Sequence, residues 1–320
     1  MSFGRPYILK TSGCIHDGWL VLSSKKDNVD QDYFFHLLGS DALYSRFSRL
    51  AAGATVKNLN IDLVASVEVE FPSLPEQRRI AAILDQAETL RTQRRTALAQ
   101  LASLAQSIFL DMLGDLVVNS NNWDEGLSLG DVAEIVSGVT KGRSLEGKAT
   151  RVVPYLAVAN VQDKALNLSA VKSIEATEDE IRRYRIQKND LLLTEGGDPD
   201  KLGRGTLWQD ELPECIHQNH VFRVRLKSNR LTPLFLNWLV GSRRGKKYFL
   251  RSAKQTTGIA SINMTQLRGF PLLVPPIVLQ RSFGDRIQAI ESLKASHRAA
   301  LAELDALFAS LQHKAFSGEL

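Results

Sequence analysis

The chain contains little cysteine, with only Cys14 and Cys215 among its 320 residues. Two cysteines are too few for a disulfide framework, and neither has the paired spacing of a zinc site. Each begins a Cys-Ile-His triplet. A metal ligand or a reactive thiol is one interpretation of the triplets, but one strand present in two copies of a fold explains them better. We therefore expect neither a shared metal nor a disulfide.

Long apolar runs and a leader sequence are also missing. No run approaches the ~18 apolar residues that span a bilayer, and the first ten residues lack the basic-then-apolar order of a signal peptide. The expected location is therefore cytoplasmic. The apolar share of 44% argues against disorder. The net charge of +5 is a mild basic excess, which suits a polyanionic partner without requiring one.

Catalytic motifs are absent as well. The sequence has no Gly-x-Ser-x-Gly elbow, no His-Glu-x-x-His and no Asn/Asp-Pro-Pro-Tyr/Phe tetrapeptide of an amino-methyltransferase. Glu195, Asp198 and Asp200 beside Lys201 could imitate a metal-dependent nuclease. They stand in a glycine-rich turn, however, and lack the strand placement of such metal sites. A nuclease is thus the least favoured alternative, and we predict a non-catalytic chain.

A long internal repeat organises what is present. Matching residues lie about 200 positions apart. The matches include Cys14-Ile15-His16 with Cys215-Ile216-His217, Phe34 with Phe235, Asn60 with Asn263, Pro72 with Pro275, Gln77-Arg78 with Gln280-Arg281, and Leu101 with Leu304. Each copy is predicted to be a globular part followed by a helix. Nothing before Met1 corresponds to residues 124–199, so we expect a truncated first globular part, which folds with help or is completed by another chain or by the C-terminal copy.

Each copy ends in a predicted long helix. After Pro75, residues 76–113 contain no Gly or Pro and are rich in strong helix formers. Apolar residues recur at heptad spacing in both copies, which predicts a coiled-coil seam. The predicted seam positions are Ile80, Ala87, Arg94, Leu101 and Ile108 with Ile83, Leu90, Ala97 and Leu104, and in the second copy Phe283, Ile290, His297, Leu304 and Leu311 with Leu293, Ala300 and Leu307. The polar pair Arg94 and His297 either sets the register or is a solvated defect.

The second globular part is predicted to mix helices and strands. Ser128 is a candidate N-cap of a short helix. Strands are expected at 152–158, 191–194, 221–226 and 270–274, because these apolar runs are bounded by Gly, Asn, Asp or Pro. A helix is expected at 234–250.

Polar side chains suited to DNA gather in a few segments of this part. Cations can neutralise phosphates, and amides and hydroxyls can reach base edges. Residues 243–254 hold six cations and no acid. The alternatives are a flexible surface turn for 137–143, a solvated face for 243–254 and strand-end caps for 218–220. The candidate DNA contacts are Thr140, Lys141, Arg143, Asn160, Gln162, Lys201, Arg204, Gln218, Asn219, Arg243, Lys246, Lys247, Lys254, Gln255, Thr256 and Thr257.

Several segments resemble the specificity subunits of type I restriction-modification systems. The resembling segments are 71–85, 104–109, 154–161, 189–192 and 315–320, and the Pro-Glu-Gln-Arg junction at 75–78 is the most specific. The resemblance implies an α+β class, with target-recognition domains of mixed α/β type joined by long helices that form an antiparallel coiled coil. The predicted domains are 1–72, the later part of a truncated first target-recognition domain; 73–123, a first spacer helix; 124–275, a complete second target-recognition domain; and 276–320, a second spacer helix.

The same resemblance implies a sequence-specific DNA-binding subunit that directs adenine methylation and DNA cleavage by partner subunits. The implied partners are double-stranded DNA, modification (methyltransferase) subunits and motor-nuclease restriction subunits, with self-association or a second chain as a way to complete the first domain. S-adenosylmethionine, ATP and Mg are expected on the partner subunits, and no cofactor on this chain. The alternative is a truncated assembly module that holds partner proteins through its helices without reading a full bipartite site.

Overall fold

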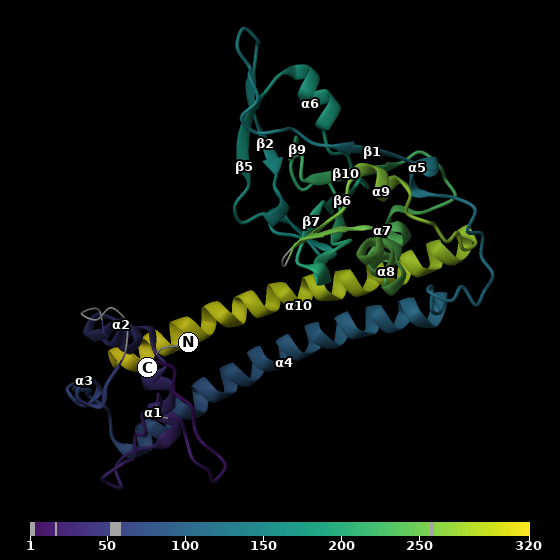
Figure 1. Cartoon of the computed structure of the whole chain (residues 1–320). Coiled ribbons are helices and arrows are strands. Elements are labelled where there is room, and N and C mark those ends of the chain that lie inside the picture. Colours follow the sequence, from purple (N-terminus) through teal and green to yellow (C-terminus); the bar gives the residue numbers. More distant parts are fainter. Residues whose placement is uncertain (1–3, 17, 52–58, 257–258) are drawn as a thin grey trace. The chain divides into compact units, whose positions relative to one another are not determined.

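The computed structural model describes residues 4–16, 18–51, 59–256 and 259–320 (Figure 1). It falls into two compact units: unit 1 is Met1–Ala102 with Glu291–Leu320, and unit 2 is Ser103–Ile290. The two long helices, α4 (Leu74–Leu113) and α10 (Ile277–Ser317), each contribute one end to each unit. Helices and strands are both present, in agreement with the predicted α+β class.

Unit 1 packs three short helices on the ends of α4 and α10. They are α1 (Gln31–Leu38), α2 (Asp41–Leu50) and α3 (Ile61–Ala65). The buried core of this unit consists of Tyr33, Leu37, Leu43, Phe47, Ile80, Ala81, Leu84 and Ala315. Among the described residues of unit 1 no strand forms.

Unit 2 contains all the described strands. Its helices are α5 (Leu129–Val132), α6 (Glu178–Tyr184), α7 (Pro233–Gly241), α8 (Arg243–Ser252) and α9 (Met264–Arg268), with short 3-10 turns η2 (Val158–Asn160) and η3 (Pro199–Lys201). Its strands are β1 (Ala133–Ser137), β2 (Arg151–Leu156), β3 (Val161–Gln162), β4 (Ala165–Leu166), β5 (Lys172–Ala176), β6 (Leu191–Thr194), β7 (Gly196–Gly197), β8 (Gly205–Leu207), β9 (Ile216–His217), β10 (Val221–Leu226), β11 (Lys254–Thr256) and β12 (Ile259–Ser261).

Three small sheets and one two-stranded ribbon form from these strands. The largest is antiparallel with the order β1-β10-β6-β8, and its central strand β6 is buried along its whole length. The second has the order β5-β2-β9, where β9 runs parallel to β2. The third, β11-β12-β7, joins the antiparallel hairpin strands β11 and β12 to a glycine pair at 196–197. Strands β3 and β4 form the ribbon.

Two of the predicted elements of unit 2 need correction. The helix predicted at 234–250 is two helices, because Ser242 ends α7 and its Oγ accepts a hydrogen bond from the Gly245 N–H (3.3 Å) as the cap of α8. The turn is so tight that a Cβ on Gly245 would lie 1.9 Å from the Val240 carbonyl oxygen. The strand predicted at 270–274 is only two isolated bridges, Ser128 with Pro271 and Asp124 with Val274. Pro271 has no N–H to donate to a ladder, which prevents regular pairing.

The internal repeat is confirmed by two buried glutamines that make matching bonds. In unit 1 the Gln77 amide oxygen accepts from the Asp30 N–H (2.8 Å), and its nitrogen donates to the carbonyls of residues 28 (3.0 Å) and 72 (2.8 Å). In unit 2 Gln280 accepts from the Thr232 N–H (2.8 Å) and donates to the carbonyls of residues 230 and 275 (both 2.9 Å). Both glutamines are fully buried. The same clamp therefore fixes the start of α1 and of α7.

The helix caps repeat in the same order. Side chains of Asp30, Ser40 and Asn60 cap α1, α2 and α3 in unit 1. Side chains of Thr232, Ser242 and Asn263 cap α7, α8 and α9 in unit 2. Each accepts a hydrogen bond from a backbone N–H three residues ahead, which satisfies a donor that the first turn leaves open. The three short helices of unit 1 thus correspond one by one to those of unit 2.

The Cys-Ile-His triplets do not have the same structure in the two copies. Ile216 and His217 form β9 and are fully buried, and Cys215 is 1% exposed. Ile15 is 39% exposed, and no strand forms at residues 14–16. The prediction of one shared strand is therefore wrong for the first copy, because no described strand of unit 1 lies beside it to complete a ladder. Both cysteines are free.

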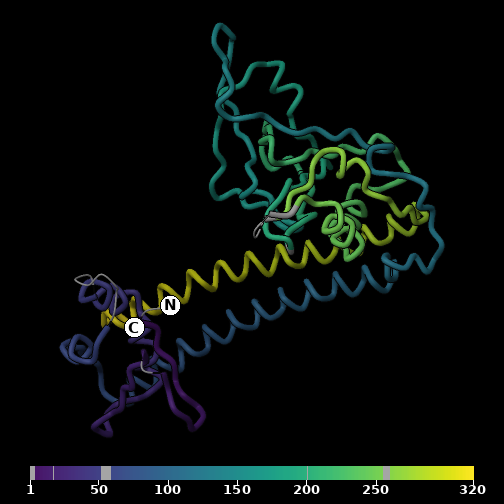
Figure 2. Tube along the Cα trace, viewed as in Figure 1, coloured from purple at the N-terminus to yellow at the C-terminus, as the bar shows by residue number. Residues whose placement is uncertain are grey.

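The two long helices pair in antiparallel directions within each unit (Figure 2). In unit 1 the Arg91 Nε donates to the Asp305 carboxylate (2.6 Å), and Arg94 Nη1 lies 3.2 Å from His297 Nδ1, so rising numbers on α4 meet falling numbers on α10. In unit 2 the rings of Phe109 and Phe283 lie 5.6 Å apart. The matched polar pair Arg94 and His297 is thus a direct contact across the seam.

The register of the seam differs from the prediction at four leucines. Leu90, Leu104, Leu293 and Leu307 are between 42% and 53% exposed. The residue one position later is buried or half-buried in each case, at 91, 105, 294 and 308. Alternating steps of three and four from Ile80 and Phe283 fit either choice, but the later position is charged at Arg91 and Lys294, so apolar patterning favours the leucines there. Only the approach of the partner helix decides between them.

By length and composition alone, α4 passes the test for a membrane-spanning helix, as the single such helix among the described residues. The match rests on the mean hydropathy of a window that also contains polar residues, and not on a continuous apolar run. The apolar window arises because the charged residues of α4 concentrate in its first half. A helix that packs along another helix, as α4 does with α10, passes the same test.

Candidate nucleic-acid interface

The polar segments singled out from the sequence converge in unit 2. The segment after β1 lies against residues 217–219: the Val139 N–H donates to the His217 carbonyl (2.8 Å), and the Asn219 N–H donates to the Val139 carbonyl (3.0 Å). Ser137 Oγ also donates to the Asn219 carbonyl (2.7 Å). The loop with Thr140 and Lys141 is therefore attached to the loop with Gln218 and Asn219.

The glycine-rich segment 195–204 joins the same region. The Glu195 N–H donates to the His220 carbonyl (3.0 Å), and the Glu195 carboxylate lies 2.5 Å from His220 Nδ1. Gly196 and Gly197 pair with β12, and a Cβ on Gly196 would lie 2.7 Å from the Ala260 carbonyl oxygen. Only glycine allows this approach, which brings the hairpin after α8 beside the other loops. Four segments distant in sequence thus form one polar surface.

Several candidate contacts are available on this surface. Thr140, Lys141 and Lys254 are exposed, and Gln218 and Asn219 are half-buried, whereas Lys201 is exposed but paired with Asp198. The Lys141 ammonium lies 5.1 Å from the centre of the Tyr155 ring, a cation–π distance that leaves its other side open to an anion. These side chains offer both donors and acceptors, as reading of base edges requires.

Other candidates hold the domain together. Arg143 makes two bonds to the Glu180 carboxylate (2.5 and 2.8 Å), and this guanidinium holds the Glu180 pKa down to about 2. Asn160 is 5% exposed, and its amide bonds the backbone of residues 157, 167 and 170. Gln162 accepts from Arg204 (3.3 Å). These side chains position loops in this structure, and any DNA contact by Arg143 would compete with its ion pair.

Three of the predicted DNA contacts lie partly or wholly outside the residues that the structure describes. Thr257 falls outside the described residues. Gln255 and Thr256 belong to β11, where their backbones pair with Ala260 and Ile259, while their side chains are outside the description. Their strand is nevertheless one arm of the hairpin that borders the polar surface.

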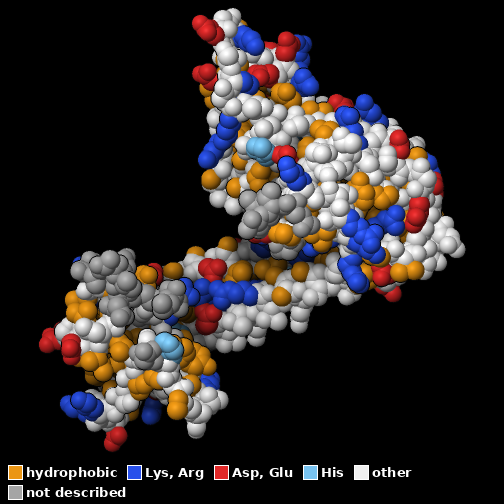
Figure 3. Space-filling view, viewed as in Figure 1, with side chains coloured by type: hydrophobic (Ala, Val, Ile, Leu, Met, Phe, Trp, Pro, Cys, Tyr) orange, Lys and Arg blue, Asp and Glu red, His pale blue; other side chains and the backbone are white. Residues whose placement is uncertain are grey.

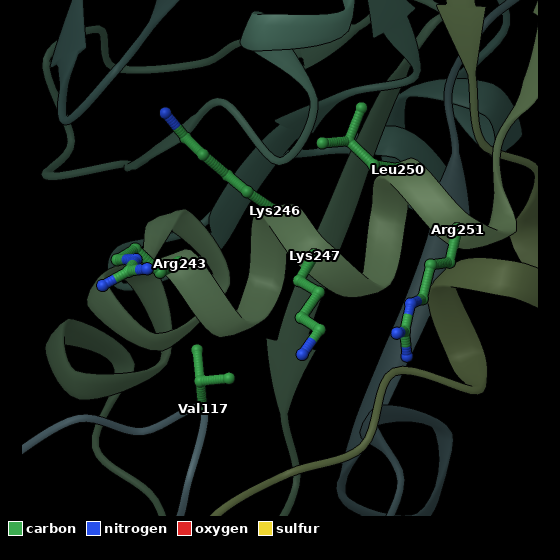
Figure 4. Close-up of a pocket in the computed structure, with 6 residues that line it drawn as sticks. All are labelled: Val117, Arg243, Lys246, Lys247, Leu250 and Arg251. Carbon is green, nitrogen blue, oxygen red and sulfur yellow. The ribbon is translucent and has the colours of Figure 1, made fainter.

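The cations of α8 line a shallow groove of about 550 Å³. Its lining residues are Val117, Arg243, Lys246, Lys247, Leu250 and Arg251 (Figure 4). In the space-filling view, Lys and Arg side chains gather over the part of unit 2 where α8 lies (Figure 3). Arg251, which was not among the candidate contacts, belongs to this set, and its place in the same acid-free helix was the signal for it.

Two of the three acidic residues that could imitate a nuclease are engaged with basic side chains, and the side chain of the third, Asp200, lies outside the described residues. Asp198 pairs with Lys201, whose ammonium lowers the pKa of that carboxyl. Glu195 pairs with His220. Across the described parts of the chain, no group of three or more His, Cys, Asp or Glu residues could hold a metal ion.

A buried histidine lies directly beneath the polar surface. His217 is fully buried, and its Nδ1 donates to the Val221 carbonyl (2.7 Å), while its Nε2 has no hydrogen-bond partner among the described residues. Burial in the apolar interior lowers the His217 pKa to about 4. A neutral imidazole is therefore part of the folded core at neutral pH.

This histidine makes stability depend on pH. Its pKa is near 6.5 in the unfolded chain and about 4 in the folded one, so the stabilisation is complete above pH 6.5 and is lost as the pH falls toward 4. The free energy of unfolding of unit 2 should fall by about 3 kcal/mol across this window. Urea unfolding followed by tryptophan fluorescence measures it, because three of the four tryptophans lie in unit 2. His217→Asn should flatten the slope between pH 6.5 and 4; an unchanged slope would contradict this assignment.

Comparison with protein families gives a match over most of the chain. The family described as "Type I restriction modification DNA specificity domain" matches residues 1–100 and again 121–306. The two matches correspond to the two copies of the internal repeat.

Individual relatives agree with this family. The chain is 25% identical over 312 residues to the type I restriction enzyme StySPI specificity subunit of Salmonella potsdam, covering 91% of this chain and 66% of that protein. It is 23% identical over 306 residues to the EcoKI specificity subunit of Escherichia coli, covering 90% and 65%. The chain thus spans just under two thirds of the length of these relatives. A solved type I S subunit from M. genitalium has a similar fold, with a TM-score of 0.53, 17% identity and coverage of 90% and 73%.

Proposed function

Since the chain belongs to the type I restriction-modification DNA specificity family, we propose that it is the DNA-reading subunit of such a system and carries no catalytic site itself. Unit 2 binds one half of the target site. The observation that supports this most is the convergence of four segments on one polar surface, namely 137–143, 195–204, 218–220 and the strand pair 254–256 with 259–261. Loops on a firm scaffold are the usual place for recognition.

The scaffold beneath these loops is rigid enough to hold them in one arrangement. Residues of β6 and β10 at 191–194 and 221–224 are buried, and the Asp190 carboxylate, 1% exposed, makes two 2.7 Å bonds to Arg225. A buried, bidentate pair of this kind fixes two strands against each other. Target sequence can then vary through the loop side chains while the sheet stays the same.

Partner subunits perform the chemistry in this proposal. The paired helices α4 and α10 provide the docking surface for modification subunits, which bind S-adenosylmethionine and methylate adenine, and for restriction subunits, which use ATP and Mg to move and cut DNA. The chain itself needs no cofactor and acts in the cytoplasm. The printed names of its relatives, which are specificity subunits of restriction enzymes, support this assignment.

The test is copurification of the chain with its modification subunit, followed by mapping of the adenines that become methylated in genomic DNA. A bipartite methylated motif is the expected result. The double variant Thr140→Ala/Lys141→Ala should weaken or relax recognition of one half of that motif only. Absence of methylation, together with no DNA binding by the complex at low salt, would refute the proposal.

One observation favours the alternative of an assembly module for the first copy. Unit 1 has the counterparts of α7, α8 and α9 but no strand among its described residues, so the reading surface of unit 2 has no described equivalent there. Limited proteolysis distinguishes the two. If residues 1–72 are cleaved rapidly and the remaining chain still copurifies with the modification subunit, the assembly module is favoured. If two half-sites are methylated, both copies of the repeat recognise DNA.

A further inference from the structure

The internal repeat allows the cations of α8 to be compared with the equivalent positions of α2. Helices α2 and α8 occupy the same place in the two copies: each begins at a serine cap, Ser40 or Ser242, and each buries one phenylalanine, Phe47 or Phe249. Aligned from these residues, the positions of Arg243, Lys246, Lys247 and Arg251 correspond to Asp41, Tyr44, Ser45 and Arg49. The shared fold therefore does not require the cations, because α2 forms and packs with only one of them.

The groove cations also differ from several arginines elsewhere in unit 2. Arg143, Arg151, Arg225 and Arg230 all pair with carboxylates. The four cations that line the groove make no ion pair with any described residue, and all four are exposed. Four like charges on ten residues of helix repel one another, which costs stability unless an anion neutralises them.

The groove has a wall that is fixed in place. Arg244, the remaining cation of α8, is largely buried, and its Nη1 donates to the Leu116 carbonyl (3.1 Å) and to Glu125 (3.4 Å). This bond holds the segment after α4, so that Val117 faces Arg243, Lys247 and Arg251 across the groove (Figure 4). One arginine of the run therefore builds the site, while the others remain available to a ligand.

We infer that this groove binds the phosphate backbone of duplex DNA, as the sequence-independent half of the interface; the inference rests on the proposed function. DNA is favoured as the occupant because α8 leads directly into β11, the first strand of the hairpin at the polar surface. DNA held by the reading loops brings a line of phosphates to the neighbouring segment. Lysine and arginine contacts to phosphate position a duplex without reading its bases.

The closing experiment compares two variants of equal charge change in the full chain. In the first, Arg243, Lys246, Lys247 and Arg251 are replaced by Gln. In the control, four exposed lysines elsewhere, Lys25, Lys26, Lys172 and Lys188, are replaced by Gln. Binding to two 40-base-pair duplexes, one with the methylated motif and one with it scrambled, is measured from 50 to 200 mM salt by fluorescence anisotropy.

Each phosphate contact contributes about 0.9 to the slope of log affinity against log salt, so the groove variant should lose a slope of about 3 to 4 on both duplexes. The affinity ratio of the two duplexes should stay within about twofold, and the control variant should keep most of the parent's slope.

Three results would overturn the inference. They are an unchanged slope in the groove variant, an equal loss in both variants, or a changed affinity ratio, which would mean that the groove reads bases or binds something other than DNA. If the unmodified chain binds neither duplex, even together with its modification subunit, the proposed function itself is wrong. Circular dichroism checks that the variant keeps its helices, which is expected because Gln is nearly as good a helix former as Lys or Arg.

Discussion

Replacing Gln280 by Ala should destabilise unit 2 by about 4 kcal/mol, the largest effect expected of any single polar substitution in the chain. The change leaves the Thr232 N–H and the carbonyls of Arg230 and Pro275 without the partner that the fully buried Gln280 side chain provides. Each buried, unsatisfied group costs about 1 to 3 kcal/mol. The start of α7 should come loose from α10, since no other side chain bridges these three groups.

The measurement is urea unfolding followed by the fluorescence of Trp208 and Trp238, which are 1% and 6% exposed in unit 2. Two comparisons make the result specific. Gln288→Ala, at an exposed position of the same helix, should cost less than about 0.5 kcal/mol. Gln77→Ala should loosen α1 in unit 1 while leaving the tryptophan transition of unit 2 unchanged. A Gln280→Ala protein as stable as the parent would mean that this clamp contributes little.

Gly138→Ala should both destabilise unit 2 and impair DNA binding. A Cβ at this position would lie 1.9 Å from the His217 carbonyl oxygen and 2.7 Å from that of Gln218. Because both obstacles are backbone atoms, the loop must move away from β9, and the bond from the Val139 N–H to His217 (2.8 Å) is lost. We expect a cost of about 3 kcal/mol, at the upper end for overpacking. DNA affinity should fall at least tenfold.

Gly142→Ala provides the comparison within the same loop. No atom lies within 4 Å of its added Cβ, but its φ of +71° is a left-handed conformation that costs an alanine about 1 kcal/mol. Thermal unfolding and anisotropy with the motif duplex measure both variants. If the two glycine variants lose equal affinity, the attachment of the loop to β9 is not what positions Thr140 and Lys141.

Elements with local signals could be predicted from the amino-acid sequence. The caps at Ser128 and the strands 191–194 and 221–226 were predicted with their bounds nearly right, because buried strands between polar turns have few alternatives. The repeat was also visible, since Gln77 and Gln280 are preserved in both copies. The acid-free run 243–254 identified the cations of α8 without any structure.

Which residues contact one another could not be predicted, because it depends on how distant elements pack. Heptad spacing allows Leu90 or Arg91 as an inner position, and the approach of α10 selects the latter. Arg143 and Lys141 look alike in sequence, but Glu180 neutralises one and leaves the other available. The pairing of Gly196 with β12 brings residues some sixty positions apart onto one surface. Such choices depend on partners that are distant in the chain, and a periodic pattern carries information only about a residue's own neighbours.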